Sequence, residues 1–276
     1  MAASQIFAPD LLAGQVAIVT GGGTNLGRTA AAELAACGAQ VVIAGRRQEV
    51  LDEAAALIGE GCSTVSADIR EPEEAARIID TALERHGRLD LLVNNAGGQY
   101  FVPAEAITAK GWRAVQRLNV GGTTNMTLAA VERAFAPAGG GTIVNVTVSP
   151  HQGFPAMAHT GAARASVEAL TREWAAQWPD IAVVAAAIGR FDTESLRKYP
   201  EVVTRGAARS VPLQRLGRME EFAWLIAMLA TPLGRSLSGT TVTLDGACDN
   251  WHGSWPPPNL VEDTGEVPTE KRRTAG

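Results

Sequence analysis

Short apolar runs alternate with amphipathic segments along the first 250 residues of the chain. The apolar runs predict strands over residues 16–20, 41–44, 64–67, 89–93, 141–148, 181–188 and 240–244. The segments between them predict helices over residues 28–37, 51–58, 73–86, 112–135, 161–178 and 220–230. Such short apolar strands, separated by helices, are typical of a parallel sheet buried on both faces. The pattern therefore predicts an α/β fold, a Rossmann-type three-layer sandwich with a seven-stranded parallel sheet.

Composition narrows the class of protein. Hydrophobic residues make up 46% of the 276 residues and charged residues 19%, as in a globular protein with a large core. The net charge of -5 gives no electrostatic reason to expect nucleic acid as a partner. The three cysteines have no metal-ligand spacing, and the longest apolar runs are too short to cross a bilayer. With no signal-peptide pattern at the N-terminus, we expect a cytoplasmic protein with no membrane partner.

The chain shows no composition break before residue 250, so one domain is expected over residues 1–250. From Trp251 onward the sequence turns proline-rich and then charged, which predicts an extended C-terminal tail over residues 251–276.

A glycine-rich loop follows the first predicted strand and precedes the first predicted helix. It reads Thr20-Gly21-Gly22-Gly23-Thr24-Asn25-Leu26-Gly27. Glycines permit a sharp turn here and let the backbone approach a pyrophosphate held at the helix N-terminus. The loop predicts a dinucleotide site, with these candidate contacts: Gly21, Gly23, Thr24, Asn25, Leu26 and Gly27.

The end of the second strand indicates which dinucleotide binds. An acidic residue at this point would bind the ribose 2′-hydroxyl of NAD, but the sequence reads Gly45-Arg46-Arg47. An arginine can instead pair with the 2′-phosphate of NADP(H). We predict NADPH, with Arg46 as the main contact and Arg47 beside it; the alternative is a pair of solvated loop arginines.

Beyond the loop, the chain resembles the short-chain dehydrogenase/reductase family over about residues 12–248. The resemblance rests on the glycine-rich loop, Asn94-Asn95-Ala96-Gly97, Asn119 and Asp245-Gly246. It implies that Asp68 contacts adenine, that Asn94 lines the cofactor site and that Asn119 is the active-site asparagine. It adds these cofactor-binding candidates: Ile69, Asn95, Ala96, Gly97, Arg164 and Gly189. It also implies a substrate lid over residues 189–211 and a homo-oligomer, either a dimer or a homotetramer.

Further motifs resemble the trans-2-enoyl-CoA reductase branch found in peroxisomes, and citronellol dehydrogenases are similar too. The motifs are Gly98-Gln99-Tyr100, Pro103-Ala104-Glu105, Lys110-Gly111-Trp112 and His159-Thr160-Gly161-Ala162-Ala163-Arg164-Ala165.

The family's catalytic Tyr-x-x-x-Lys pair is missing. Its positions read Thr160 and Arg164. Threonine is no acid near neutral pH, and arginine stays protonated, although it can hold ribose hydroxyls and supply charge. The family's serine corresponds to Thr147 by spacing or to Val148 by strand alignment, with Ser149 adjacent. Thr147 and Ser149 are thus candidate hydroxyl donors, or loop caps.

Without an acid, reduction of an α,β-unsaturated thioester fits better than reduction of a ketone, because the charge spreads into an enolate. Candidate donors are Thr147, Ser149, Thr160 and His159; the alternative for His159 is a histidine bonded to backbone at a helix start. We interpret His151 as a loop residue. Tyr100 lies by the cofactor loop and could reach the substrate, but we interpret it as a packing aromatic.

The sequence leaves three functions open. The first is an NADPH-dependent oxidoreductase that reduces a small enoyl-thioester-like molecule, acyl-CoA being a candidate. The second is an alcohol or carbonyl oxidoreductase for a terpenoid-like molecule. The third is a catalytically silent dinucleotide-binding subunit, favoured by Ile188 where the family has proline and by Asn25 where it has glycine. In the lid, apolar residues could line a pocket, and basic ones could meet CoA phosphates or lie on a solvated helix: Phe191, Leu196, Tyr199, Arg190, Arg197, Lys198 and Arg205.

Overall fold

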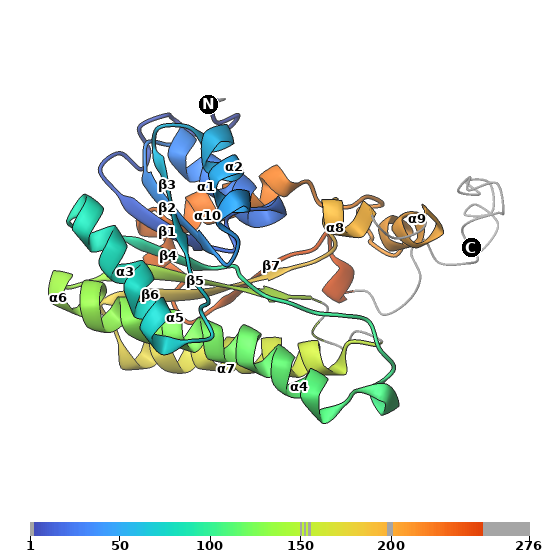
Figure 1. Cartoon of the computed structure of the whole chain (residues 1–276). Coiled ribbons are helices and arrows are strands. Elements are labelled where there is room, and N and C mark those ends of the chain that lie inside the picture. Colours follow the sequence, from blue (N-terminus) through green and yellow to red (C-terminus); the bar gives the residue numbers. More distant parts are fainter. Residues whose placement is uncertain (1–2, 150, 152, 154–155, 198–200, 251–276) are drawn as a thin grey trace.

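Seven parallel strands form one sheet in the order β3-β2-β1-β4-β5-β6-β7 (Figure 1). The computed structural model describes residues 3–149, 151, 153, 156–197 and 201–250, so the expected C-terminal tail lies outside the described residues. The strands are β1 (Val16–Thr20), β2 (Gln40–Gly45), β3 (Cys62–Ser66), β4 (Leu91–Asn94), β5 (Gly141–Val148), β6 (Ile181–Ile188) and β7 (Thr241–Leu244). The predicted α/β fold with a seven-stranded parallel sheet is confirmed.

Helices cover both faces of the sheet. They are α1 (Asn25–Ala36), α2 (Gln48–Ile58), α3 (Pro72–His86), η1 (Ala104–Ala106), α4 (Ala109–Gln116), η2 (Arg117–Gly122), α5 (Thr123–Ala130), η3 (Val131–Phe135), α6 (Ala136–Ala138), α7 (Ala158–Gln177), α8 (Glu194–Arg197), α9 (Glu201–Arg209), α10 (Met219–Leu229), α11 (Pro232–Ser236) and η4 (Cys248–Asn250). In Figure 1, α1, α2 and α10 lie on one face, and α3, α5 and α7 lie on the other.

The segment from α4 to α6 runs without a break and includes the π-helical stretches η2 and η3. It begins at Ala109, three residues before the predicted start at Trp112. The reason is an N-cap: the Thr108 hydroxyl accepts a hydrogen bond from the Gly111 N–H at 3.0 Å.

The core has two halves, one on each side of the sheet. All five residues of β1 are buried, and successive residues enter different halves: Val19 packs toward α1 and α10, whereas Ile18 packs toward α3 and α5. Burial on both faces explains why the strands read as continuous apolar runs rather than as alternating ones.

The order of the strands fixes where a ligand can bind. The sheet grows from β1 in one direction through β2 and β3, and in the other through β4 to β7. In such sheets the crevice lies outside the carboxyl ends of the strands, where the order reverses. The loops after β1, β4, β5 and β6 meet at this edge, and α8 and α9 lie beside it (Figure 1).

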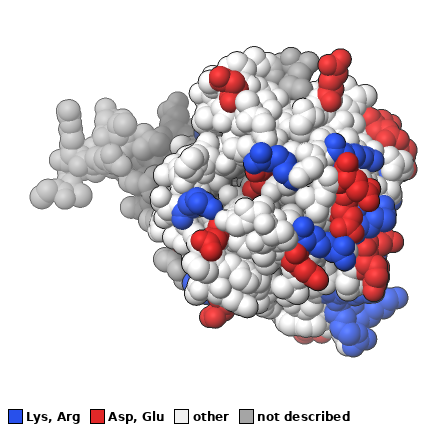
Figure 2. Space-filling model, turned by 90° about the vertical axis from the view of Figure 1, so that its left-hand side faces the viewer, with Lys and Arg blue, Asp and Glu red and all other residues white. Residues whose placement is uncertain are grey.

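Opposite charges are interleaved on the face drawn in Figure 2, which carries no extended basic patch. Among the ion pairs of the described residues, Arg133 pairs with Asp80 at 2.8 Å and joins η3 to α3. Within the described ranges, no helix is both long enough and apolar enough to span a bilayer. The described residues also hold no group of three or more side chains suited to a metal ion.

Candidate functional site

A cavity of about 900 Å³ opens at the carboxyl edge of the sheet, beside β1 and β4. Its wall contains all the residues that the sequence suggested for the cofactor except Asn94: Gly21, Gly23, Thr24, Asn25, Leu26, Gly27, Arg46, Arg47, Asp68, Ile69, Asn95, Ala96, Gly97, Arg164 and Gly189. Of the suggested catalytic residues, Thr147, Ser149 and Arg164 line the cavity. Asn119, His159 and Thr160 are not among its lining residues and are fully buried.

The glycine-rich loop is packed as tightly as its composition predicts. Gly21 has a left-handed backbone with φ 66°. A Cβ on Gly27 would lie 2.3 Å from the Gly21 carbonyl oxygen and 2.6 Å from Asn95 Nδ2, so only glycine fits there. Thr20 ties this loop to the one after β4: its hydroxyl accepts from the backbone N–H groups of Asn95 and Ala96 at 3.0 Å. The two loops are therefore held as one unit.

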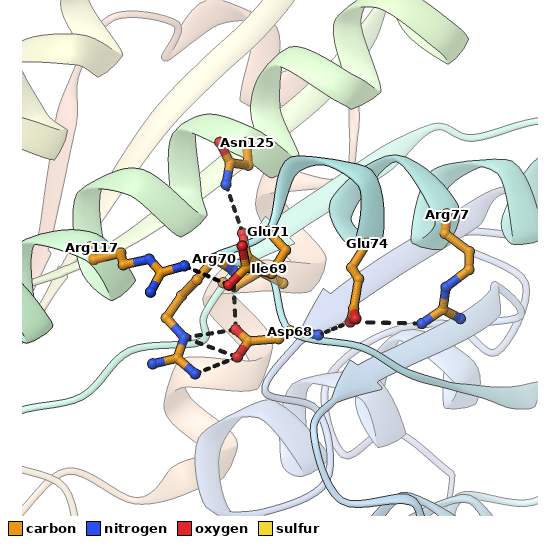
Figure 3. Close-up of polar contacts among 8 residues, drawn as sticks. All are labelled: Asp68, Ile69, Arg70, Glu71, Glu74, Arg77, Arg117 and Asn125. Atoms are coloured by element: carbon orange, nitrogen blue, oxygen red, sulfur yellow. Dashed lines mark hydrogen bonds and ion pairs between the residues drawn. The ribbon is translucent and has the colours of Figure 1, made fainter.

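Asp68 lies after β3 at the end of the cavity where the adenine is expected. Arg70 Nε donates to both carboxylate oxygens of Asp68 at 2.9 Å (Figure 3). These hydrogen bonds lower the pKa of Asp68, and the nearby charge of Arg46 adds to the effect. Asp68 is thus ionised at neutral pH, but Arg70 compensates its charge, so it does not oppose an anion bound at Arg46.

The same loop is anchored to neighbouring helices on two sides. The Asp68 N–H donates to Glu74 at 2.5 Å, at the start of α3. From α5, Asn125 Nδ2 donates to the Ile69 carbonyl oxygen at 3.0 Å, and Arg117 in η2 pairs with Glu71 at 2.5 Å (Figure 3). Residues 68–71 are therefore fixed before any ligand binds.

Arg164 is the dominant charge at the opposite end of the cavity. It lies on α7 and is 7% exposed. Its Nη1 donates to the Val146 carbonyl oxygen at 2.7 Å, while its Nε has no partner in the described part of the chain. Desolvation by burial lowers the pKa of Arg164 to about 10, so it remains a cation at neutral pH. A buried cation with no carboxylate partner is costly and marks a place where a ligand supplies the missing acceptor.

Gly97 makes room for this cation. A Cβ at position 97 would lie 2.3 Å from Arg164 Nη2 and 2.8 Å from Asn119 Oδ1. Asn119 in turn holds the loop after β4, because its Nδ2 donates to the Gly98 carbonyl oxygen at 2.8 Å and its Oδ1 accepts from the Gly98 N–H at 3.2 Å. By these contacts Asn119 positions the cavity wall from behind.

Thr147 and Ser149 are not free donors. The Thr147 hydroxyl donates to Glu168 Oε1, and the Ser149 hydroxyl donates to Asp245 Oδ2, each at 2.7 Å. A hydroxyl has one hydrogen, so neither has a hydrogen left to donate to a ligand while the carboxylates are ionised. Sequence reasoning missed both carboxylates. Helical spacing was the available signal for Glu168, which lies four residues after Arg164 on α7.

His159 and Thr160 lie behind the cavity wall, at the start of α7. Neither ring nitrogen of His159 has a hydrogen-bond partner within the described ranges, and the same is true of the Thr160 hydroxyl. The His159 ring instead packs edge-on against Tyr100, with 4.5 Å between the ring centroids. Tyr100 therefore packs against His159 and also lines the cavity, so the contact agrees with a packing role and the position agrees with access to a substrate.

Asn94, which the resemblance placed at the cofactor, is absent from the described cavity wall. Its Nδ2 donates to Thr127 and to Asn145, at 3.0 Å and 2.9 Å, beneath the sheet edge. This side chain satisfies buried polar groups and does not reach the cavity.

The lid touches the glycine-rich loop directly. Asn25, which has a left-handed backbone with φ 44°, accepts a hydrogen bond at Oδ1 from the Glu194 N–H at 3.0 Å. Arg28 pairs with the Glu194 side chain at 3.4 Å. Thr193 and Leu196 on the same segment line the cavity. Asn25 therefore links the loop expected to hold the pyrophosphate with the segment expected to cover the substrate.

The basic residues of the lid do not act alike. Arg190 lines the cavity, whereas Arg197 is exposed and pairs with Asp192 at 2.9 Å, as expected for a solvated helix. Arg205 is exposed on α9. Lys198 and Tyr199 lie outside the described residues.

The Asn25→Gly variant tests the link between loop and lid. Glycine keeps the left-handed backbone but removes the acceptor, and one such hydrogen bond is worth about 0.5–1.5 kcal/mol. We expect the KM of the substrate to rise roughly 2- to 10-fold, with little change in dinucleotide affinity. Amide hydrogen exchange at residues 193–197 should accelerate, while exchange in α10 serves as the internal control. Unchanged exchange at 193–197 together with an unchanged KM would exclude the link.

Comparison with known proteins adds family-level evidence. A family model described as "Enoyl-(Acyl carrier protein) reductase" matches residues 22–247. A zebrafish (Danio rerio) peroxisomal 2,4-dienoyl-CoA reductase is 32% identical to this chain, and the match covers 91% of this chain and 85% of the zebrafish protein. A probable 2,4-dienoyl-CoA reductase of Bacillus subtilis is 34% identical, and the match covers 87% of this chain and 97% of the bacterial protein. Among solved structures, a citronellol catabolism dehydrogenase of Pseudomonas aeruginosa matches with a TM-score of 0.79 and 37% identity, over 88% of this chain and 98% of that one.

Proposed function

The chain belongs to the short-chain dehydrogenase/reductase family of oxidoreductases, and we propose that it is an NADPH-dependent reductase of a conjugated enoyl-thioester, with acyl-CoA as the substrate. One observation carries the proposal: Arg164 places in the cavity wall a buried positive charge that no carboxylate among the described residues compensates. Such a charge stabilises an oxyanion and passes on no proton at neutral pH. An enolate of a thioester needs that kind of partner.

The cavity wall also lacks the usual proton donors. Among its described lining residues there is no histidine or lysine, and its single tyrosine, Tyr100, is 41% exposed and packs against His159. Ketone reduction needs an acid at the carbonyl oxygen, whereas conjugate reduction delays protonation to the α-carbon. The missing acid therefore favours the enoyl-thioester.

The residues present fit a nicotinamide dinucleotide, which the family implies as the cofactor. The amides of residues 21–27 would hold the pyrophosphate, Asp68 and Ile69 the adenine, and Arg164 and Gly189 the nicotinamide side. Four of the described lining residues are arginines and one is acidic, which suits a polyanionic ligand: Arg46, Arg47, Arg164, Arg190 and Asp68. When bound, the cofactor supplies the hydride. Arg46, with no acid at the end of β2, supports NADPH.

Apolar side chains at the other end of the cavity support an acyl chain as the substrate. They come from the loop after β4, from the start of α7 and from the lid: Phe101, Met157, Phe191 and Leu196. The printed names of several relatives specify 2,4-dienoyl-CoA, which agrees with a conjugated thioester.

The test follows NADPH oxidation by absorbance with 2-enoyl-CoA and 2,4-dienoyl-CoA esters of several chain lengths. Turnover with either class supports the proposal, and a preference for the dienoyl esters would define the class further. Tight NADPH binding without oxidation by any thioester would favour the catalytically silent subunit instead.

A second candidate, an alcohol or carbonyl oxidoreductase for a terpenoid-like substrate, is favoured by the structural match named as a citronellol catabolism dehydrogenase. It expects turnover with free alcohols, aldehydes or ketones and none with thioesters. The same assay with citronellol and citronellal therefore separates the two.

We further propose that the protein is a homo-oligomer, a tetramer by family resemblance, and that it is cytoplasmic. Exposed Leu128 on α5 lies on the helical layer that would carry the contact. Light scattering during gel filtration checks the assembly. Cell fractionation checks the location, for which the peroxisomal relatives provide the competing expectation.

A further inference from the structure

We propose that Glu168 and His151 form a proton relay that recharges Thr147, so that the Thr147 hydroxyl delivers the proton required at the substrate α-carbon. This proposal rests on the proposed function, because it needs a reaction in which a carbon is protonated after hydride addition. Thr147 is the catalytic residue of the relay; Glu168 and His151 act through it as positioning residues.

The three side chains form an unbroken path from the cavity to the surface. Thr147 lines the cavity, and its hydroxyl is 2.7 Å from Glu168 Oε1. The same oxygen is 3.0 Å from His151 Nε2. Glu168 is 7% exposed, whereas the side chain of His151 is 34% exposed and can exchange protons with water. A buried carboxylate thus bridges a cavity hydroxyl and a solvent-accessible imidazole.

The protonation state of Glu168 sets what Thr147 can do. While Glu168 is ionised, Thr147 gives its one hydrogen to the carboxylate and offers only lone pairs to the cavity. If His151, as imidazolium, passes its Nε2 proton to Glu168, the carboxylic acid can donate to Thr147. The Thr147 hydrogen is then free to turn toward the substrate.

The step balances in atoms and electrons. Reduction of the conjugated system takes one hydride, which brings two electrons, and one proton. As the Thr147 O–H bond breaks, its proton forms the new C–H bond at the α-carbon. The Glu168 O–H proton moves to the Thr147 oxygen, the Nε2 proton of His151 moves to Glu168, and His151 regains a proton from water. The net result is one proton from solvent per turnover.

Surrounding charges favour the imidazolium form of His151. From η4, Asp249 accepts the His151 backbone N–H at 2.6 Å and lies 2.5 Å from Nδ1. From α7, Glu168 faces Nε2. Behind them, Asp245 accepts from the Asp249 N–H at 2.8 Å, and Arg190 contacts Cys248. Desolvation alone would lower the pKa of His151, but the hydrogen bonds and charges of Asp249 and Glu168 outweigh it and raise the pKa. These contacts therefore keep His151 charged up to a higher pH than an ordinary histidine.

The competing role is purely structural: in that case, the same contacts serve only to hold η4 against the loop after β5. A structural tie affects folding and substrate affinity. A relay affects the rate and its dependence on pH, because only protonated His151 can supply the proton. The two roles are therefore separable by kinetics.

The experiment measures kcat against pH with the most active enoyl- or dienoyl-CoA and saturating NADPH. For the wild type, kcat should be level at acidic pH and fall as the pH rises through the raised His151 pKa. In His151→Gln and Glu168→Gln, kcat should drop about 100-fold or more and lose that falling limb, since a positioned acid contributes about 100- to 10,000-fold. NADPH affinity and KM should change less than about twofold. His86→Gln, at the distant end of α3, is the matched control and should match the wild type.

The outcomes separate the two proposals. Wild-type turnover with unchanged kcat and pH profile in both variants overturns the relay and leaves the proposed function standing. A wild-type kcat that does not fall as the pH rises from the ordinary histidine range, about pH 5–8, to the highest pH at which the enzyme stays folded also overturns the relay, even if both variants fail to fold. No turnover of any thioester by the wild type overturns the proposed function and the relay with it.

Discussion

Replacing Arg164 with methionine is expected to lower kcat/KM about 100- to 1000-fold, the usual loss when one oxyanion-stabilising donor is removed from an active site. The guanidinium lies in a desolvated part of the cavity wall, where its charge is poorly screened and therefore strongly felt by a developing enolate. Steady-state assays with the enoyl- or dienoyl-CoA substrate measure the change. The loss should fall mainly in kcat, because the charge on the substrate develops only in the transition state.

The same substitution is expected to leave stability unchanged or to raise it. Methionine fills similar apolar space. Removal of a buried charge that has no carboxylate partner within the described residues offsets the loss of the bond to the Val146 carbonyl. Thermal unfolding should therefore occur at the same temperature or higher. Arg164→Lys is the matched control: it keeps a cation and should recover part of the activity. A methionine variant that keeps full activity would exclude the catalytic role of Arg164. A variant that unfolds at a clearly lower temperature would show that Arg164 stabilises the fold.

The loss of activity with retained stability has a general physical meaning. Stability alone would select an apolar side chain at position 164, so a buried cation there indicates that a ligand completes its environment. Gly97 supports the same conclusion, because any larger side chain would collide with the guanidinium. The presence of arginine at position 164 and of glycine at position 97 is therefore explained by a ligand bound in the cavity.

The layers of the fold were predictable because burial leaves a signal in the sequence. All eight residues of β6 are buried, so this strand appears in the sequence as a continuous apolar run of the same length. Boundaries were harder, because caps decide them: the Thr108 side chain starts α4 earlier than the apolar pattern does. Short elements such as α11 and η4 escaped prediction, since too few residues repeat to establish a period.

The site was predictable where backbone geometry restricts the residue type, as at Gly27, where the neighbouring carbonyl excludes any Cβ. It was not predictable where side chains from distant segments meet. His151 is 98 residues from Asp249 and 17 from Glu168, and no local pattern encodes either contact. For that reason, a histidine interpreted as a loop residue became part of a network that reaches the cavity. Conversely, His159 was a candidate donor because of its side-chain type, but it is buried and is not among the residues that line the cavity.

Replacing Arg46 with alanine is expected to weaken NADPH binding about 10- to 100-fold and to leave NADH binding nearly unchanged. A hydrogen bond to a charged group contributes about 1.5–3 kcal/mol, which corresponds to that range of affinity. Only NADPH carries the 2′-phosphate that would meet the guanidinium, so the loss should be selective. Calorimetric titration of wild type and variant with both dinucleotides measures it directly.

Two controls sharpen the interpretation of the Arg46 variant. Arg47→Ala, at the neighbouring residue of the cavity wall, should have a smaller effect if Arg46 is the main contact. Salt should weaken NADPH binding to the wild type more than to Arg46→Ala, because exposed charge pairs are screened. The ionised Asp68 would repel a nearby phosphate, but Arg70 neutralises it, so the preference for NADPH should persist across neutral pH. Tighter binding of NADH than NADPH by the wild type, or an equal loss for both cofactors in the variant, would assign the 2′-phosphate contact elsewhere.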